Sequence, residues 1–369
     1  MSEQTDKEVM SITILMLSLT GAGKTKATID LANALSSICD VTIATIRPLI
    51  LPPSYPIEEA VKVVSMMDFG PKDESPAIAF KIFSDDVTVT ESSRIEYYLK
   101  HIETQFFYIP NMDSPLYWLV EKNLPKHVIS ILGDHGGRRN NSLESVVEKN
   151  CITAYHTDYY FGSAAKAFDA IHCINPLNAD IYKKLNENII NIPNICSLPE
   201  ANTTDIDRED KIILVGSLNK IKQHHKAIRA FARVHKRHPS WTMHIYGYGG
   251  LENKLIELIE RLDLKERVFL EGKTNNIQDK YSESKLYLSA SNFESFGLTY
   301  VEAMLNGLQI MSFDGHLGAR YLLSDGRGIL VEHNDIKGLA IVLFRTLVAL
   351  SKPSLERDQL LESNKEFAR

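Results

Sequence analysis

Residues Ser289 to Met304 read SASNFESFGLTYVEAM and continue the apolar run KLYLSA, which predicts a short buried strand. A loop follows this strand, and a helix is expected to begin near Leu298 or Thr299. Gly297 allows the backbone to be approached closely at the start of that helix. Free N–H groups and the positive end of the helix dipole favour an anion at such a position. The stretch therefore predicts a strand, a loop and a helix N-terminus that can hold an anion.

Two carboxylates flank this helix start, Glu294 in the loop and Glu302 one turn into the helix. Two carboxylates and exposed amides suit a ligand that carries both hydroxyls and phosphates, such as a sugar nucleotide. A simpler interpretation is also open, because Thr299-x-x-Glu302 has the pattern of a capping box. On that interpretation Glu302 only stabilises the helix, and Glu294 is an ordinary acid of an exposed loop.

The longer stretch SNFESFGLTYVEAMLNGLQIMS resembles the donor-site signature of family 4 retaining glycosyltransferases of GT-B fold. The two glutamates eight residues apart, F-G-L between them and E-A-M-x-x-G-L after them carry the resemblance. The motif F-G-L-T is similar to that of one branch of the family, which contains poly(glycerol-phosphate) glucosyltransferases and glucosaminyltransferases of serine-rich surface proteins. The resemblance implies an α/β chain with two doubly wound, Rossmann-like domains that face a cleft.

The resemblance also implies roles for the residues of this stretch. Glu302 would hold the ribose hydroxyls of the nucleotide, and Glu294 would orient the hexose through its hydroxyls. Backbone amides, together with a lysine, would stabilise the leaving diphosphate. The residues expected in that third role are Phe296, Gly297, Leu298, Thr299 and Lys222.

Length and composition are those of an ordinary globular protein, with 369 residues, 44% hydrophobic residues and 24% charged residues. This length favours two domains. The net charge of −6 gives no reason to expect nucleic-acid binding. Four scattered cysteines without a C-x-x-C pair are typical of a reduced, cytoplasmic protein. The apolar run Met10 to Leu19 is too short to span a bilayer, so we expect at most peripheral membrane contact.

The N-terminal half begins with a predicted strand at Ile12–Leu17, a glycine-containing loop at Leu19–Lys24, a helix and a strand at Val41–Ile46. The loop sequence SLTGAGKT is close to a P-loop, but Ser18 stands where a P-loop requires glycine, which disfavours a nucleotide triphosphatase. The loop resembles the glycine-rich first loop of the glycosyltransferases. That resemblance places three residues beside the donor phosphates and the acceptor, namely Gly21, Ala22 and Gly23.

Two histidines of the first half follow predicted strands. The strand Cys151–Tyr155 runs into His156, which resembles the family histidine that contacts the donor sugar. A histidine of an ordinary surface loop is the simpler interpretation. His135, within Gly133–Arg139, is a weaker candidate for the same role.

Alternating strands and helices divide into two series, which predicts two parallel sheets. We expect a first, acceptor-side domain over 1–196, a polar linker over 197–210, a nucleotide-sugar-binding domain over 211–350 and a C-terminal tail over 351–369. The strands expected in the second domain are Lys211–Val215, Thr242–Tyr246, Val268–Glu271, Leu286–Ser289, Gln309–Ser312 and Gly328–Val331. The resemblance implies a last helix that returns to the first domain, and the chain stops where that helix is expected to begin.

The first strand of the second domain ends in VGSLNKIKQ. In the family this turn carries an arginine and, five residues later, a lysine, and the two clamp the donor diphosphate. Lys222 matches the lysine, but Ser217 stands at the arginine position, and a lysine cannot reproduce the bidentate contacts of a guanidinium. Lys220 and Arg320 are candidates to supply the charge. The simpler interpretation of Lys222 is a solvated lysine at a helix start.

Further positions of the second domain resemble donor-binding elements. Gly247 belongs to a G-x-G turn, and Lys273 and Thr274 belong to the loop whose backbone meets the nucleobase in the family. Four histidines lie on or near one lysine-rich helix and are expected on the solvated surface: His224, His225, His235 and His238. No Asp-x-Asp pair stands in a site-like context, so we expect neither a metal nor another cofactor.

Together these features predict a retaining glycosyltransferase that acts in cell-wall or polysaccharide biosynthesis. It would move a hexose from a nucleotide sugar, a UDP-sugar, to a cell-surface polymer, glycan or protein acceptor. In that role we expect Glu294, His156 and Lys222 to be catalytic. The alternative is a non-catalytic, glycosyltransferase-like binding partner of an active transferase, because Ser217 weakens the phosphate clamp. A glycoside hydrolase could also use two carboxylates, but it has no use for a phosphate site.

Overall fold

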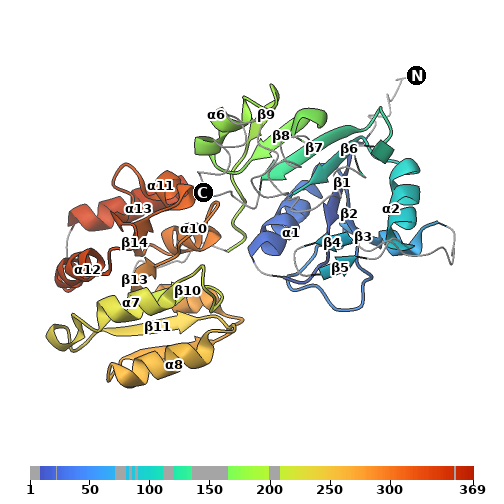
Figure 1. Ribbon diagram of the computed structural model, residues 1–369. Coiled ribbons are helices and arrows are strands. Elements are labelled where there is room, and N and C mark those ends of the chain that lie inside the picture. Colours follow the sequence, from blue (N-terminus) through green and yellow to red (C-terminus); the bar gives the residue numbers. More distant parts are fainter. Residues whose placement is uncertain are drawn as a thin grey trace. The chain divides into compact units, whose positions relative to one another are not determined.

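The computed structural model of the protein describes residues 9–21, 23–70, 80–82, 85–87, 90–110, 120, 122–134, 165–198, 208–352 and 355–369. The chain divides into two compact units, Met1–Ile195 and Cys196–Arg369. Each unit is built around a parallel sheet (Figure 1). Among the described residues, no helix has both the length and the apolar character needed to cross a membrane.

The sheet of the first unit has seven strands in the order β3-β2-β1-β6-β7-β8-β9, and every neighbouring pair is parallel. The strands are β1 (Ser11–Met16), β2 (Asp40–Thr45), β3 (Lys62–Ser65), β6 (Phe106–Ile109), β7 (Ile129–Asp134), β8 (Ala170–Cys173) and β9 (Ile189–Asn191). They bury apolar residues on both faces, as strands of a parallel sheet with helices on both sides do.

The remaining elements of this unit lie around the sheet. In the part of this unit that the structure describes, the helices are α1 (Gly23–Leu35), α2 (Thr90–Lys100) and α6 (Ala179–Tyr182), with short turns η1 (Met66–Asp68) and η2 (Pro176–Asn178). A separate antiparallel hairpin joins β4 (Phe80–Ile82) and β5 (Asp85–Val87). Ile14, Ile29 and Ile43 belong to a core on the α1 side, and Leu99 and Phe107 belong to a second core. Strand β3 was not expected from the sequence, and it extends the sheet beside β2.

The sheet of the second unit has six parallel strands in the order β12-β11-β10-β13-β14-β15. They are β10 (Glu209–Val215), β11 (Thr242–Tyr246), β12 (Val268–Gly272), β13 (Ser284–Ser289), β14 (Gln309–Asp314) and β15 (Ile329–Glu332). Numbered within the unit, this order is 3-2-1-4-5-6, the order of a Rossmann sheet. The strand order reverses between β10 and β13, and ligands of such sheets bind beyond the carboxyl ends of the strands at this switch point.

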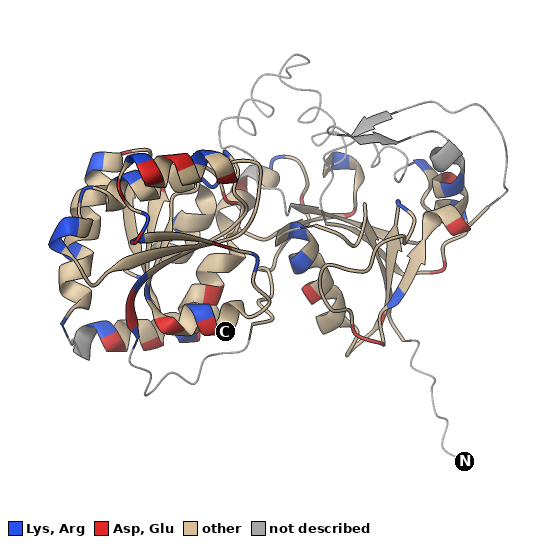
Figure 2. Ribbon diagram, turned by 90° about the horizontal axis from the view of Figure 1, so that it is seen from below, with Lys and Arg blue, Asp and Glu red and all other residues tan. Residues whose placement is uncertain are grey.

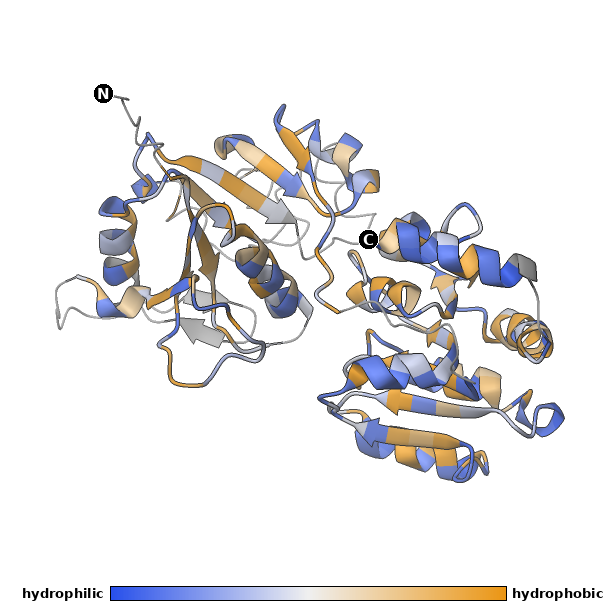
Figure 3. Cartoon of the chain, turned by 180° about the vertical axis from the view of Figure 1, so that it is seen from behind, coloured by the Kyte–Doolittle hydropathy of each residue, from blue (hydrophilic) through white to orange (hydrophobic). Residues whose placement is uncertain are grey.

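Helices cover both faces of this sheet. The elements are α7 (His224–Phe231), η3 (His235–Arg237), α8 (Glu252–Arg261), α9 (Ile277–Glu283), α10 (Leu298–Leu305), α11 (Leu317–Leu323), α12 (Ile336–Leu350) and α13 (Leu355–Ala368). Helices α7, α8 and α12 pack on one face, where Phe231, Trp241 and Leu343 are buried in the core. In this unit both strands and helices carry hydrophobic colour, and the helices also carry hydrophilic colour (Figure 3). Charges of both signs lie mainly on helices and loops (Figure 2).

Helix α13 occupies the segment that the sequence presented as a tail. It packs on α10, and Asn364 donates a hydrogen bond to the carbonyl of Arg327 at 2.7 Å. The guanidinium of Arg327 lies 4.0 Å from the ring centroid of Phe367, a cation–π geometry. The last helix therefore belongs to the second unit.

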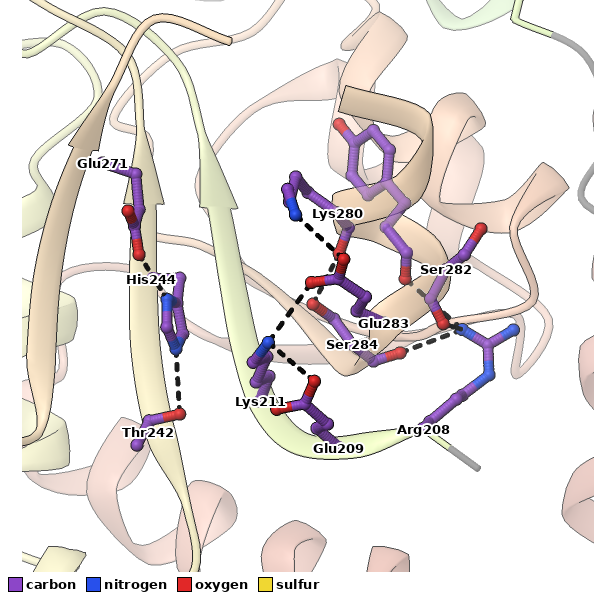
Figure 4. Close-up of polar contacts among 11 residues, drawn as sticks. Arg208, Glu209, Lys211, Thr242, His244, Glu271, Lys280, Ser282, Glu283 and Ser284 are labelled. Carbon is purple, nitrogen blue, oxygen red and sulfur yellow. Dashed lines mark hydrogen bonds and ion pairs between the residues drawn. The ribbon is translucent and has the colours of Figure 1, made fainter. Parts of the chain in front are cut away.

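Strand β10 begins at Glu209, inside the expected linker. Arg208 fixes this start, because its guanidinium donates to the carbonyls of Ser284 at 2.9 Å and Asn306 at 2.6 Å. Figure 4 shows Arg208 beside Ser284. The start of β10 is thereby tied to the start of β13 and to the end of α10.

Candidate functional site

Two loops meet at the switch point of the second sheet, one after β10 and one after β13. The amide of Asn292, in the loop after β13, donates to the carbonyl of Ile221 in the loop after β10 at 2.8 Å. The sequence predicted functional side chains in both loops. The fold brings these two sets of residues together.

A second turn, after β11, supports the loop after β10. The amide of Gly216 donates to Tyr246 at 2.9 Å, and the amide of Leu218 donates to Tyr248 at 2.9 Å. Gly247 has φ +147°, and a Cβ there would lie 2.0 Å from the carbonyl oxygen of Gly216. Glycine is therefore required at 247 for the two turns to pack, which is a structural reason for the predicted G-x-G turn.

Lys222 is held at the end of the loop after β10. Its amide donates to Oδ1 of Asn219 at 3.0 Å, and its aliphatic stem packs against Gly216. Its ammonium forms an ion pair with Oε1 of Glu294. Ser291 donates to the same oxygen at 3.0 Å. A predicted cation and a predicted carboxylate are therefore direct partners.

Electrostatics keep Glu294 ionised in this position. Burial acts to raise the pKa of its carboxyl, but the Lys222 ammonium outweighs burial, with help from Ser291, and the net pKa is lowered. The side chains remain 22% exposed for Lys222 and 16% exposed for Glu294. The pair is thus largely desolvated but still accessible to a ligand.

Helix α10 begins at Leu298, as the sequence predicted. Gly297 is its N-cap residue with φ +93°, and no side chain caps the helix. The first amides of a helix have no carbonyl partner within it, so the N–H groups of Leu298 and Thr299 are directed out of the helix end. A Cβ at Gly297 would lie 2.3 Å from the ring of Tyr300, so the turn accepts only glycine.

The capping-box interpretation of this helix is wrong. The N-cap position belongs to Gly297, and the hydroxyl of Thr299 instead accepts a hydrogen bond from Tyr287 at 2.7 Å. Glu302 is only 6% exposed and accepts a hydrogen bond from the Tyr281 hydroxyl at 2.9 Å. Glu302 is thus a buried carboxylate with a fixed orientation, and its presence is not explained by capping.

His224 lies near Lys222, and the sequence did not identify it as a residue of the site. The expectation of a solvated histidine is wrong for it, because it is 4% exposed, and wrong for His238, which is 8% exposed. Neither ring nitrogen of His224 makes a hydrogen bond of ordinary geometry with the described residues. Burial, with the charge of nearby Lys222, lowers its pKa to about 4. The polar sequence HHK around His224 suggests an exposed helix start. Only the place of His224, one residue after a β-α turn, could have indicated that its side chain is buried.

His316 is a second buried histidine, and it caps α11. Its Nδ1 accepts from the amide of Ala319 at 3.1 Å, so the proton of the neutral ring is on Nε2, 3.4 Å from the Tyr300 hydroxyl. Burial lowers its pKa to about 4. Arg320 on the same helix forms an ion pair with Asp314 at 2.5 Å. One of the two cations considered as replacements for the missing arginine therefore already has a partner, and the other, Lys220, is exposed.

Other predicted donor-binding residues lie in the loop after β12, in the first unit, or outside the described residues. Lys273 is exposed after β12, and the hydroxyl of Thr274 accepts from the amide of Asn276 at 3.1 Å. In the first unit the amide of Gly21 donates to Ser54 at 3.2 Å, and Gly23 begins α1. Ala22, His135 and His156 lie outside the described residues.

Within the described parts of the chain, no three histidine, cysteine or carboxylate side chains gather as a metal site would require. The second-unit site instead offers one ammonium, a helix N-terminus and two carboxylates. Cation and amides suit a phosphate, and carboxylates suit hydroxyl donors. This combination matches a ligand with both kinds of group.

Comparison with known proteins supports this chemistry. Residues 200–346 match the family described as "Glycosyl transferases group 1". The chain is 30% identical over 160 residues to the poly(glycerol-phosphate) alpha-glucosyltransferase of Bacillus subtilis, which is 43% of this chain and 24% of that protein. It is 32% identical over 194 residues to an N-acetylgalactosaminyltransferase of Campylobacter jejuni that acts on a diphospho-undecaprenol, covering 52% of this chain and 50% of that protein. The chain thus spans half or less of these two relatives' length.

Solved structures are similar over nearly the whole chain. A mutant of Staphylococcus aureus TarM, in complex with Fondaparinux, alpha-GlcNAc-glycerol and UDP, has a TM-score of 0.74 and 15% identity, covering 97% of this chain and 96% of that one. The pneumococcal O-GlcNAc transferase GtfA, in complex with UDP and GlcNAc, has a TM-score of 0.74 and 14% identity, covering 98% and 97%. At these identities the likeness establishes the fold.

Proposed function

We propose that the protein transfers a hexose from a UDP-sugar, because residues 200–346 match the glycosyl transferases group 1 family and the chain has the GT-B fold. The acceptor is a cell-surface polymer, glycan or protein, and the anomeric configuration is retained. The relatives named above act on poly(glycerol-phosphate) and a diphospho-undecaprenol, and two similar structures contain UDP. The proposal places the reaction in the cytoplasm, in cell-wall or polysaccharide biosynthesis.

The observation that carries the proposal is the ion pair of Lys222 with Glu294 beside the open N-terminus of α10. Both groups stand at the carboxyl ends of β10 and β13, at the switch point of the sheet. A cation and free amides at this point favour a diphosphate. The adjacent carboxylate is placed for the sugar attached to it.

Each group then has a separate task. The Lys222 ammonium and the first amides of α10 hold the diphosphate and stabilise the charge that grows on it as it leaves. Glu294, oriented by Ser291 and Lys222, accepts hydrogen bonds from the hexose hydroxyls. Glu302, deeper in α10, accepts from the ribose hydroxyls.

The transfer step exchanges one bond for another at the anomeric carbon. The bond to the diphosphate oxygen breaks, and a bond to the acceptor hydroxyl oxygen forms on the same face of the sugar. The proton of that hydroxyl passes to the leaving diphosphate. This route retains configuration and requires no protein nucleophile, and Glu294 acts by orienting the sugar.

We further propose that the reaction needs no metal and no other cofactor, because Lys222 and the amides at the start of α10 supply the positive charge. Transfer is expected to survive treatment with EDTA. Complete loss of transfer with EDTA, restored by manganese, would contradict this part of the proposal.

The proposal also gives roles to residues of the first unit. Gly21, Ala22 and Gly23 are proposed to lie beside the donor phosphates and the acceptor, and His156 beside the donor sugar. The start of α1 at Gly23 supports this proposal, because the first amides of a helix favour an anion. Gly21→Ala would place a Cβ 2.3 Å from the Thr25 hydroxyl, so it tests the loop conformation as well as the contact.

Calorimetric titration tests the donor. UDP, UDP-glucose, UDP-N-acetylglucosamine and UDP-galactose are titrated into the wild-type chain and into Lys222→Ala. Lys236→Ala, which removes an exposed lysine of the same unit, is the matched control. Binding of UDP by the wild type and the control, with a loss of about tenfold or more in Lys222→Ala, is expected. Equal affinity in all three chains would reject the site.

One observation favours a second candidate, a non-catalytic binding partner of an active transferase. Ser217 supplies no guanidinium to the clamp, and Arg320 is occupied by Asp314. A transfer assay with labelled UDP-sugars separates the two functions, with poly(glycerol-phosphate) and a serine-rich peptide as acceptors. Tight UDP binding with no transfer or donor hydrolysis by any of these mixtures would favour the binding partner.

A further inference from the structure

Three tyrosines form a fully buried group beneath α10. Tyr281 comes from α9, Tyr287 from β13 and Tyr300 from α10 itself, and none is more than 2% exposed. The ring centroids of Tyr281 and Tyr287 are 6.2 Å apart, and those of Tyr287 and Tyr300 are 5.6 Å apart at 86°. The rings therefore connect α9, β13 and α10 through one tilted contact and one edge contact.

The three tyrosine hydroxyl groups have different hydrogen-bond partners. Tyr281 donates to Oε2 of Glu302 at 2.9 Å, and Tyr287 donates to Oγ1 of Thr299 at 2.7 Å. The Tyr300 hydroxyl pairs with that of Ser312 at 2.9 Å and lies 3.4 Å from Nε2 of His316. Two of the three hydroxyls thus end on side chains of the candidate site.

The Tyr281 hydroxyl is a dependable donor. Burial and the adjacent Glu302 raise its pKa well above the ordinary value, so the phenol stays protonated. A neutral hydroxyl that donates to a carboxylate makes a short, strong bond with defined geometry. Because both side chains are buried, this bond restricts rotation of the Glu302 carboxylate about its last side-chain torsion.

We propose that Tyr281 is a positioning residue that orients the Glu302 carboxylate for the ribose hydroxyls of the nucleotide. The inference rests on the proposed function, because Glu302 must contact the ribose for its orientation to matter. Binding then occurs to an acceptor group that is already aligned, so little conformational freedom is lost at that moment. Tyr281 touches neither the sugar nor the phosphates and acts through Glu302 alone.

The test compares Tyr281→Phe with Tyr300→Phe, each of which removes one buried hydroxyl and leaves the ring. Titrations use UDP and 2′-deoxyuridine diphosphate, and thermal unfolding is recorded for every chain. A site built to receive a hydroxyl discriminates against the ligand that lacks it. We expect the wild type to prefer UDP by about tenfold. Tyr281→Phe should weaken UDP binding about fivefold or more and reduce the preference for UDP over the deoxy ligand. Tyr300→Phe, which should lose a similar amount of stability, should keep the wild-type UDP affinity and the wild-type preference.

The possible outcomes distinguish the failure of the role of Tyr281 from the failure of the proposed function. A lower unfolding temperature in Tyr281→Phe with unchanged preference for UDP would show a purely structural tyrosine and overturn the inference. A wild type that binds UDP without preferring it to the deoxy ligand would also overturn it, because Glu302 would then not hold the ribose. No UDP binding by the wild type would overturn the proposed function, and the inference with it.

Discussion

Two turns at the same edge of the second sheet differ in how well their residues are fixed. In the turn after β13, Glu294 is held by Lys222 and Ser291, and Glu302 by Tyr281. In the turn after β10, Gln223 adopts a left-handed conformation with φ +48°, which is costly for a residue with a side chain. His224 next to it is buried, and neither of its nitrogens has a well-formed hydrogen bond within the described chain.

The difference shows where this chain departs from the pattern of the family that it resembles. The carboxylate side of the site, which consists of Glu294 and Glu302, has the expected residues, and each carboxylate has a defined partner. The cation side has Ser217 in place of arginine, a strained N-cap and an uncharged buried histidine. We infer that the donor is oriented mainly from the carboxylate side, while Lys222 alone carries the charge of the diphosphate contact.

The largest effect is expected from Lys222→Ala, since no guanidinium shares its task. Donor affinity should fall about 10- to 100-fold and transfer by about 100-fold or more, the range for lost charge stabilisation. The loss also leaves Glu294 without its ammonium, so the free energy of unfolding should drop by about 1–3 kcal/mol. Titration, transfer assays and chemical denaturation measure the three quantities.

A double-mutant cycle with Glu294→Ala separates stability from binding. The two residues are in direct contact, so the double variant should be more stable than the sum of the single losses predicts, by about 1 kcal/mol or more. Additive losses would mean that the ion pair contributes nothing. Undiminished transfer in Lys222→Ala would indicate that another cation contacts the diphosphate. Lys220 would be the first candidate.

The next effect is acid sensitivity. Burial lowers the pKa of His224 and His316 to about 4 from an unfolded value near 6.5. Between these values the unfolded chain binds more protons than the folded chain, so stability falls as pH decreases from about 6.5 to about 4. The loss is up to about 3 kcal/mol for each histidine. The pKa of Glu294 is also lowered, which adds a further loss at lower pH, as its carboxylate is protonated.

Denaturation between pH 7 and pH 4.5 measures this dependence. His224→Gln should reduce the slope of stability against pH, whereas His127→Gln, which changes an exposed histidine, should leave it unchanged. Equal slopes in the wild type and His224→Gln would indicate that the pKa of His224 is not lowered in the folded chain, so that its ring is protonated below about pH 6.5. The cation side of the site would then hold a second charge.

The smallest effect is expected from Ser217→Arg, which restores the family residue. The new guanidinium would stand beside Lys222 on a turn already packed against Gly247. We therefore expect UDP affinity to stay within about threefold or to fall. Tenfold tighter binding would show that the diphosphate contact lacks a cation and would strengthen the binding-partner alternative.

Much of the second unit could be predicted because buried parallel strands are continuous apolar runs. All six strands were expected within two residues of their observed bounds, and Thr242–Tyr246 matched. In the first unit, Lys62–Ser65 was missed because it is a short edge strand in a proline-rich stretch. Leu355–Ala368 was missed as a helix because it is mostly polar and is fixed by α10 and Arg327.

The site was predicted where sequence spacing carries the information and missed where partners come from distant elements. Glu294, Glu302 and the start of α10 follow from one stretch. The ion pair with Lys222 spans 72 positions, and the bond from Tyr281 to Glu302 joins two helices. His224 resembles a surface residue because its neighbours in the sequence are polar, although its own side chain is buried.

UDP titration into Glu302→Ala tests the central claim most directly, with far-UV circular dichroism and thermal unfolding as checks on the fold. The account predicts a folded chain whose UDP affinity is lower by about 10- to 100-fold, equivalent to about 1.5–3 kcal/mol for a lost hydrogen bond to a charged group. Unchanged UDP affinity with only a lower unfolding temperature would show that Glu302 serves the stability of α10 and does not contact a nucleotide.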